Sequence, residues 1–271
     1  MRERVIFGAI QLSSQADLAA NLARVGELVA SAAERGARVV VLPENFAFMG
    51  EEAERAAVAE DLDDNGPIVG SLGAAARRHG IWIVAGGLPE RSSEPSRPFN
   101  TCAVIDHEGR LAARYRKIHL FDVEVGDGSR YHESGSTTAG DAPVVTDVAG
   151  VRLGLSICYD LRFPELYRAL STAGAEALVV PAAFTLVTGK DHWHVLLRAR
   201  AIEAQAYVVA AAQWGKHPRG RQTFGKTCIV DPWGEIVAQA SEGEGVITAT
   251  LDPAYLERVR ANLPSLRHRR L

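Results

Sequence analysis

The chain is poor in cysteine and has no long apolar run. Its 271 residues include only three cysteines, Cys102, Cys158 and Cys228, which lie far apart. An odd number of scattered cysteines argues against a disulfide framework and indicates a reducing compartment. No charged leader with an apolar core precedes the first strand, and no apolar stretch approaches the roughly 18 residues of a membrane span. We therefore expect a cytoplasmic protein without a membrane partner.

The chain also lacks a strong charge of one sign. Its 30 Lys and Arg residues against 33 Asp and Glu residues leave a net charge of −3. Such a balance gives no reason to expect a nucleic-acid partner. His192 and His194 are two apart on a predicted helix and do not share a face, so we expect no metal site. The glycine pair Gly86-Gly87 lacks the context of a nucleotide fingerprint, and we expect no cofactor.

No linker rich in Ser, Gly or Pro and no internal repeat divides the chain. Its composition, 47% hydrophobic and 23% charged, is that of an ordinary globular protein. We expect one domain over residues 1–271, with about the last ten residues as a C-terminal tail.

The first part of the chain alternates between strand-like and helix-like patterns. Apolar runs at Val5–Leu12, Arg38–Glu44 and Ile81–Leu88 predict strands, and helical spacing at Asp17–Arg35 and Pro67–His79 predicts helices between them. A polar, Ala-rich helix is also expected after Glu44. This β-α-β-α-β order predicts a parallel sheet with helical crossovers.

The rest of the chain adds hairpins and further alternation. Phe99–Asp106 and Arg110–Arg116 flank a turn and predict a hairpin, whereas Lys117–Asp141 predicts a long loop of the kind that is often functional. After a second hairpin the α/β alternation resumes, with a helix predicted over Asp191–Gln205. Three antiparallel strands and a short helix from Pro253 close an α/β fold with two β-sheets.

Cys158 ends an alternating apolar strand, Arg152–Ile157, and Asp160 and Pro164 after it are typical of a helix start. This strand-to-helix turn would direct the thiol toward backbone N–H groups, a setting that suits a nucleophile. A buried cysteine that only fills space is the alternative, because free cysteines are commonly buried.

Two other reactive side chains also stand where a predicted strand ends. Glu44 follows Val39–Pro43, and Lys117 follows Leu111–Arg116. A surface acid and a solvated lysine are their ordinary explanations. Active sites of parallel sheets form at the carboxyl ends of strands, and a carboxylate, an ammonium and a thiol together meet the needs of acyl transfer. We expect Lys117 to favour the thiolate, Glu44 to take the proton, and the backbone N–H of Tyr159 to bind an oxyanion.

Three segments that carry these residues resemble the signatures of the nitrilase-superfamily carbon–nitrogen hydrolases. They are Leu42–Asn45, Tyr115–Asp122 and Ile157–Glu165, in the expected order. The resemblance extends over nearly the whole chain and implies a four-layer α-β-β-α sandwich, in which two mixed sheets are flanked by helices. It implies Glu44 as general base, Lys117 as oxyanion-stabilising cation and Cys158 as nucleophile. Glu133 matches a second glutamate that the family keeps near the lysine.

Within the superfamily the chain is most similar to the Nit branch of ω-amidase-like enzymes, on segments that include Gly189–Glu203, Tyr207–Gln213 and Asp231–Gly234. This similarity implies a cysteine-dependent amidase that cleaves deaminated glutathione to 2-oxoglutarate and cysteinylglycine through a thioester. It also implies a homodimer or a higher homo-oligomer. His194, which stands where an acidic residue is expected, departs from the pattern. The alternatives are an ω-amidase for 2-oxoglutaramate or another small amide or N-carbamoyl compound, and a nitrilase-like scaffold or binding protein.

A dicarboxylate-like substrate needs cationic partners in the pocket. Arg130, Arg219 and Arg221 lie in predicted loops where they could bind it, although each could equally be a surface arginine. Phe121 and Phe184 follow Lys117 and the predicted strand Ala177–Ala182, and we expect them as pocket walls.

Overall fold

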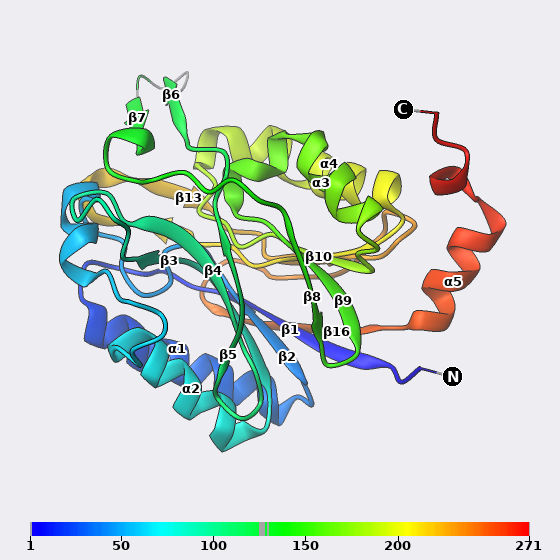
Figure 1. Ribbon diagram of the computed structural model, residues 1–271, viewed down its shortest axis with the longest axis horizontal. Helices are drawn as coiled ribbons and strands as arrows, with labels where there is room; N and C mark the ends of the chain where they lie inside the picture. The colour runs from blue at the N-terminus through cyan, green and yellow to red at the C-terminus, as the bar shows by residue number, and fades with distance from the viewer. Residues whose placement is uncertain (1, 125–127, 129, 271) are drawn as a thin grey trace.

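The structure is a computed structural model that describes residues 2–124, 128 and 130–270 (Figure 1). Two six-stranded sheets face each other and helices cover their outer faces. Helices α1 (Leu18–Glu34) and α2 (Pro67–His79) cover one sheet, and α3 (Pro164–Thr172) and α4 (Leu186–Ala204) cover the other. The predicted α/β fold, a four-layer α-β-β-α sandwich of two mixed sheets, is confirmed.

The first sheet has the strand order β16-β1-β2-β3-β4-β5. Its centre, β1 to β3, is parallel, as the alternation predicted, and antiparallel pairing adds β16 on one side and β4 and β5 on the other. The strands are β1 (Val5–Gln11), β2 (Val39–Leu42), β3 (Trp82–Glu90), β4 (Phe99–Ile105), β5 (Leu111–Arg116) and β16 (Gly245–Leu251).

The second sheet has the order β15-β14-β11-β10-β9-β8, again with a parallel centre, β9 to β11. The strands are β8 (Val144–Val148), β9 (Val151–Leu155), β10 (Ala177–Val179), β11 (Tyr207–Ala210), β14 (Cys228–Val230) and β15 (Ile236–Gln239). Each sheet thus brings the carboxyl ends of its parallel strands to one edge, where sites of α/β proteins form.

The alternation of side chains along β2 explains why layers form on both faces of its sheet. Val39 and Val41 point into the core between the two sheets, and Val40 and Leu42 pack with the apolar faces of α1 and α2. All four are fully buried. Burial of one such side chain contributes about 1.5–3 kcal/mol, so a continuous apolar strand is stable only between two covering layers.

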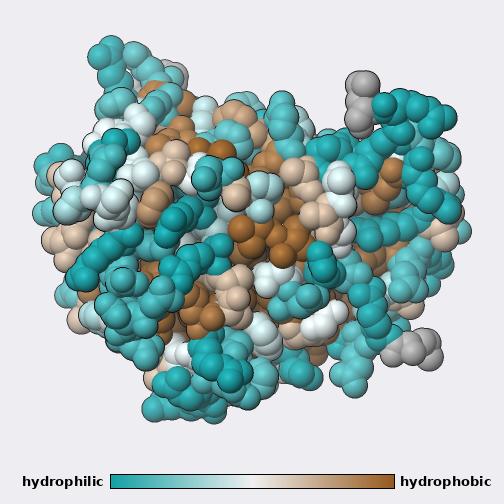
Figure 2. Space-filling view, in the orientation of Figure 1, coloured by the Kyte–Doolittle hydropathy of each residue, from teal (hydrophilic) through white to brown (hydrophobic). Residues whose placement is uncertain are grey.

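The two sheets also meet at one open side of the sandwich. β5 and β8 are the last strands of their sheets and contact each other there. Val144, Val145 and Ile118 are partly buried and pack against the inter-sheet core. On the face shown in Figure 2, hydrophobic residues gather near the middle, and hydrophilic residues surround them.

Several predicted elements differ from the structure. The helix expected after Glu44 is a 3₁₀ helix, η1 (Glu52–Val58), and the predicted loop Lys117–Asp141 contains the strand pair β6 (Asp122–Glu124) and β7 (Arg130–His132) and the 3₁₀ turn η2 (Glu133–Gly135). Residues 125–127 and 129 of that predicted loop lie outside the described residues. The sequence did not indicate the remaining strand pair, β12 (Trp214–Lys216) and β13 (Gln222–Phe224). The short 3₁₀ turn η4 (Pro218–Gly220) lies between these two strands.

Helix boundaries near the predicted site also shift. The helix expected directly after Cys158 begins as a 3₁₀ turn, η3 (Cys158–Arg162), and α3 starts only at Pro164. Helix α4 begins at Leu186, earlier than predicted, because the side chain of Thr185 accepts a hydrogen bond from the N–H of Thr188 and caps it.

The C-terminal part consists of α5 (Pro253–Asn262) and the turn η5 (Ser265–Arg267). It lies beside the helical layer, where Arg269 Nη1 donates to Thr172 Oγ1 at 3.0 Å (Figure 1). One domain with a C-terminal tail stays a prediction, which the core shared by the two sheets supports. Within the described ranges, no helix combines the length and hydrophobicity needed to cross a bilayer.

Candidate active site

Cys158 lies in a strained turn just beyond β9. Its φ is +47°, in the left-handed region, and its N–H donates to the carbonyl of Pro181 at 2.8 Å. A non-glycine residue in that region is uncommon and persists when the surroundings hold it. The turn makes the side chain half-buried, whereas Cys102 and Cys228 are fully buried in strands.

Asp160 holds this turn from inside. The fully buried carboxylate accepts hydrogen bonds from the N–H of Ile157 at 2.9 Å and the hydroxyl of Tyr115 at 2.7 Å. Its other oxygen lies 2.7 Å from Nδ1 of His119, whose ring stacks on Phe163. Asp160 therefore ties β5 and the segment after it to the turn that carries Cys158.

Glu44 follows β2 and is buried where the two sheets meet. Its Oε2 accepts a hydrogen bond from the N–H of Ala183, which follows β10 of the other sheet, at 3.1 Å. Gly86 and Gly87 of β3 leave room for this approach. A Cβ on Gly87, whose φ is +67°, would lie 2.8 Å from Cα of Glu44, and one on Gly86 would lie 1.9 Å from Cβ of Pro181. The glycine pair that the sequence left without a role is therefore a packing requirement of the site.

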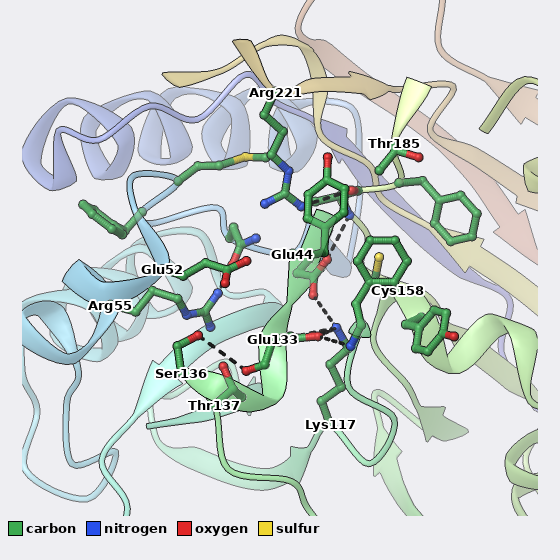
Figure 3. A pocket seen from close by; sticks show the side chains of 18 of the residues that line it. Glu44, Glu52, Arg55, Lys117, Glu133, Ser136, Thr137, Cys158, Thr185 and Arg221 are labelled. Atoms are coloured by element: carbon green, nitrogen blue, oxygen red, sulfur yellow. Dashed lines mark hydrogen bonds and ion pairs between the residues drawn. The ribbon is translucent and has the colours of Figure 1, made fainter. Parts of the chain in front are cut away.

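Lys117 joins two carboxylates at the centre of the site (Figure 3). Its Nζ lies 3.1 Å from Oε1 of Glu44, and 3.0 and 2.7 Å from the two carboxylate oxygens of Glu133. Asn100 of β4 donates from Nδ2 to Oε1 of both glutamates, and the N–H of Phe121 donates to Oε2 of Glu133 at 2.7 Å. All three charged groups are buried, so each one depends on the others for compensation.

The pairing of Lys117 with the two glutamates determines the protonation states of Lys117 and Glu133. Burial alone would lower the pKa of Lys117, but the charges of Glu133 and Glu44 outweigh burial and raise it above its ordinary value. Burial alone would raise the pKa of Glu133, but the charge and hydrogen bond of Lys117 lower it to about 2. Lys117 is therefore an ammonium and Glu133 a carboxylate at neutral pH.

Burial and two opposing charges set the pKa of the Cys158 thiol. Burial, followed by the charge of Glu44, raises its pKa well above the usual value, and Lys117 opposes this shift only in part. Lys117 already compensates two carboxylates, which is why its charge does not hold a thiolate as well. We therefore expect a neutral thiol in the resting protein, which would need a base in order to attack a substrate.

These residues line one open cavity that encloses about 700 Å³, including the part open to solvent (Figure 3). Glu44, Lys117, Glu133, Cys158 and Tyr159 all lie along it. The sequence had thus selected from four separate segments residues that the fold brings together. Within the described chain, the N–H of Tyr159 donates no hydrogen bond, so it is available to bind an oxyanion.

The residues proposed for substrate binding divide into two groups. Phe121, Phe184 and Arg221 line the cavity. Arg130 and Arg219 do not: Arg130 pairs with Glu124 and its side chain is 78% exposed, and Arg219 pairs with Glu51 and is 73% exposed.

Three other residues that lie at the cavity or its charge cluster were not predicted from the sequence. Asn100 is fully buried in an otherwise apolar strand, and a polar side chain in such a run was the one available signal. Arg55 and Tyr131 line the cavity, but Arg55 lies in a polar Ala-rich stretch and Tyr131 in a predicted loop, where neither stands out.

His194, the departure from the expected pattern, does not line the cavity. It lies on α4, where its ring meets Phe224 edge-on and burial lowers its pKa. Among the residues that the structure describes, no group of three His, Cys, Asp or Glu side chains could hold a metal ion.

The fold and the site together define a hydrolase of carbon–nitrogen bonds. Residues 7–261 match the carbon–nitrogen hydrolase family, and the chain belongs to this family. It is 47% identical over 268 residues to the deaminated glutathione amidase of Synechocystis sp., with 96% of each chain covered. It is 42% identical to the human deaminated glutathione amidase, over 99% of this chain and 83% of that one.

Two solved structures with the same fold carry Nit names. The crystal structure of the C. elegans NitFhit protein has a TM-score of 0.92 and 41% identity. It covers 98% of this chain, which spans only 65% of that longer chain. Nit3 of Saccharomyces cerevisiae, a member of branch 10 of the nitrilase superfamily, has a TM-score of 0.88 and 33% identity over 97% of this chain and 96% of its own. The resemblance to the nitrilase superfamily and its Nit branch is confirmed.

Proposed function

We propose that the protein hydrolyses a linear amide through a thioester on Cys158, with Glu44 as general base and acid and Lys117 as the cation that stabilises the oxyanion. The observation that carries this proposal is the convergence of Glu44, Lys117, Glu133 and Cys158 on one cavity. A raised thiol pKa beside a buried carboxylate is what a base-assisted nucleophile requires.

In the first half-reaction, the sulfur of Cys158 attacks the amide carbon while its proton passes to Glu44. The carbonyl oxygen becomes an oxyanion between Nζ of Lys117 and the N–H of Tyr159. Glu44 then gives its proton to the departing nitrogen, the C–N bond breaks, and the amine leaves from a thioester. Glu133 stabilises the charge of Lys117 throughout and orients the ammonium through two hydrogen bonds.

In the second half-reaction, Glu44 takes a proton from a water molecule that attacks the thioester carbon. The same oxyanion position is used again, and the C–S bond breaks as the thiol of Cys158 regains a proton from Glu44. One carboxylate therefore serves both halves, and the acid product leaves with the enzyme in its starting state.

The proposed substrate is deaminated glutathione, and the products are 2-oxoglutarate and cysteinylglycine. The support is the 42–47% identity over nearly the whole chain to relatives named deaminated glutathione amidase. 2-Oxoglutaramate, another small amide or an N-carbamoyl compound is the second candidate, since the same chemistry would serve them. A nitrilase-like scaffold has no need of an intact Glu44, Lys117 and Cys158.

The test compares purified protein on deaminated glutathione and on 2-oxoglutaramate by their kcat/KM values. We expect the larger value for deaminated glutathione and no turnover of either substrate by the Cys158→Ala variant. A larger value for 2-oxoglutaramate would make the protein an ω-amidase. If wild type and Cys158→Ala are equally inert on both and on a wider amide panel, the scaffold alternative is correct.

We also propose a cytoplasmic homodimer or higher homo-oligomer. The support is the resemblance to the Nit branch; Val187, Val195 and Ile202 of α4 are exposed apolar residues that an interface on this helix would cover. Light scattering coupled to size exclusion measures the mass directly, and a monomer over the working concentration range would overturn this proposal.

A further inference from the structure

Arg55 is a buried arginine whose hydrogen-bonding capacity is only partly used. It lies on η1, is 9% exposed and lines the cavity. Its Nη1 donates to Oδ1 of Asn45 at 2.6 Å, whereas its Nε and Nη2 are buried and have no partner among the described residues. A buried donor without a partner costs free energy, so a group that occupies the cavity and accepts from it would be stabilised.

The two unpartnered nitrogens are a matched pair. Nε–H and Nη2–H of a guanidinium lie on the same edge and point in parallel, which fits the two oxygens of one carboxylate. The hydrogen bond that Nη1 of Arg55 donates to Asn45 holds the third nitrogen and orients the Nε–Nη2 edge before a ligand binds. Asn45 is itself fixed by a hydrogen bond from its N–H to the carbonyl of Gly87, next to the segment that positions Glu44.

The charge around Arg55 also favours an incoming anion. Glu44 and Glu133 are engaged with Lys117, and Glu52, which also lines the cavity, is exposed at its rim. Arg55 forms no ion pair in the described chain, yet it is close enough for its charge to contribute to the lowered pKa of Glu133. Its positive charge is therefore directed at the reaction side of the cavity and is not compensated by a paired carboxylate.

A third unused group lies beside it. Thr137 follows the turn η2 that carries Glu133, is fully buried, lines the cavity, and has a hydroxyl oxygen without a partner in the described residues. In Figure 3, Arg55 and Thr137 approach the cavity from the same side, near Glu133. A carboxylate bound by the edge of Arg55 on this side would lie in the same cavity as the thiol of Cys158.

We propose that Arg55 is the specificity residue for the acyl half of the substrate, and that its Nε–Nη2 edge binds the carboxylate of a 2-oxo-acid or similar ω-carboxylated acyl group. This inference rests on the proposed function. Because that carboxylate stays on the acyl group after the amine has left, Arg55 holds the thioester as well as the substrate. Arg221, which lines the cavity but is less buried, remains for the leaving half.

The test compares an anionic and a neutral amide of the same length, 2-oxoglutaramate and pentanamide, in wild type and Arg55→Leu. Two charge-assisted hydrogen bonds are at stake, so we expect Arg55→Leu to reduce the ratio of the two kcat/KM values by about 100-fold or more. Pentanamide shares the chemistry at Cys158, so the ratio removes any effect that Arg55 has through Glu133. Arg55→Lys, which keeps the charge and loses the edge, should fall between the two, and the exposed Arg78→Leu on α2 should leave the ratio unchanged.

A second measurement, of binding, serves if the neutral amide is hydrolysed too slowly for kinetics. Calorimetric titration of 2-oxoglutaramate into Cys158→Ala and into Cys158→Ala with Arg55→Leu should show about a 100-fold weaker Kd in the double variant. An equal loss on both substrates, or an unchanged ratio with an unchanged Kd, would overturn the role of Arg55. If wild type hydrolyses no amide but the Kd still depends on Arg55, then the proposed function fails and the binding site stands.

Discussion

The side-chain amide of Asn100 lies 3.0 Å from Oε1 of Glu44, and the same Nδ2 lies 3.1 Å from Oε1 of Glu133. One neutral donor thus bridges the two carboxylates that share Lys117. It draws them to one ammonium without adding a charge to a buried cluster.

Asn100→Asp should therefore be far more harmful than its similar size suggests. It would place a third carboxylate, fully buried, beside two others. We expect kcat/KM to fall by about 100-fold or more and the free energy of unfolding to fall by about 3–5 kcal/mol. Asn100→Ala, which removes the donor and adds no charge, is the control and should lose less in both assays. Equal losses would mean that the charge balance is not what Asn100 protects.

Glu133→Gln tests the charge of Lys117 through pH. The pKa of Glu133 in the folded protein is about 2, below its ordinary value of 4.5. A carboxyl with a lowered pKa stabilises the fold above its unfolded pKa and loses this contribution as pH falls toward the folded pKa. The free energy of unfolding, from urea titrations, should favour wild type over Glu133→Gln most at pH 6 and less at pH 3.

In the same variant, kcat should fall by about 100-fold at neutral pH, because Lys117 loses the partner that orients it. A difference in stability that does not change between pH 6 and pH 3 would contradict the lowered pKa of Glu133.

Alkylation by iodoacetamide measures the thiol of Cys158 directly. Only this cysteine should react in the native protein, since Cys102 and Cys228 are fully buried. Its raised pKa means that the reaction is slow at pH 7 and accelerates with pH past the range of an ordinary thiol. Mass spectrometry of peptides identifies the modified residue, and rapid alkylation at pH 7 would show that the resting nucleophile is a thiolate.

Glu44→Gln separates the two effects of Glu44 on the same thiol. Removal of its negative charge should lower the pKa of Cys158 and speed alkylation at pH 7 to 8. Loss of the base should nevertheless reduce amide hydrolysis by about 1,000-fold or more. The paired assays distinguish a base from a residue that only shapes the pocket, because loss of shape alone would slow both reactions.

Tyr115→Phe and Asp160→Ala form a graded pair on the nucleophile turn. Tyr115→Phe removes one hydrogen bond to Asp160 and should cost about 1 kcal/mol of stability. Asp160→Ala leaves the N–H of Ile157 and the hydroxyl of Tyr115 without their acceptor, so we expect a loss of about 3 kcal/mol or more. Thermal and urea unfolding measure the stability of the two variants, and Asp160→Ala should be the less stable of them. Equal losses would mean that Asp160 does not hold the turn.

The sequence predicted the strands and helices of the first sheet well because apolar periodicity determines them, whereas the four-layer arrangement was implied by the resemblance to the family. The run at β2 and the helical spacing of α1 and α2 indicate buried strands and covering helices, and the structure has them within a few residues of the predicted bounds. The predicted helix boundaries were wrong where a capping side chain or a loop determines the first residue. Helix α4, for example, begins directly after the capping residue Thr185.

The site was predicted in part for a different reason. Glu44, Lys117 and Cys158 were predicted because each follows a strand and lies in a segment that resembles a family signature. That these strands belong to two different sheets was not visible in the sequence. Arg55 and Asn100 were missed because their importance lies in what surrounds them: a partner for only one guanidinium nitrogen, and two carboxylates around one amide. The charge of Lys117 does favour the thiolate of Cys158, as predicted, but burial and the charge of Glu44 raise the thiol pKa further, and no spacing in the sequence reveals that balance.

The hydrogen bond from the N–H of Ala183 to Glu44 crosses from one sheet to the other, and so does the close packing of Gly86 on Pro181. The proposed base and nucleophile thus belong to opposite halves of the sandwich. Catalytic activity therefore depends on the relative position of the two sheets. On heating, a small displacement of one sheet against the other would abolish activity while the circular dichroism of both sheets is still unchanged. Inactivation should precede melting, and the gap between the two temperatures would measure the tolerance of the interface.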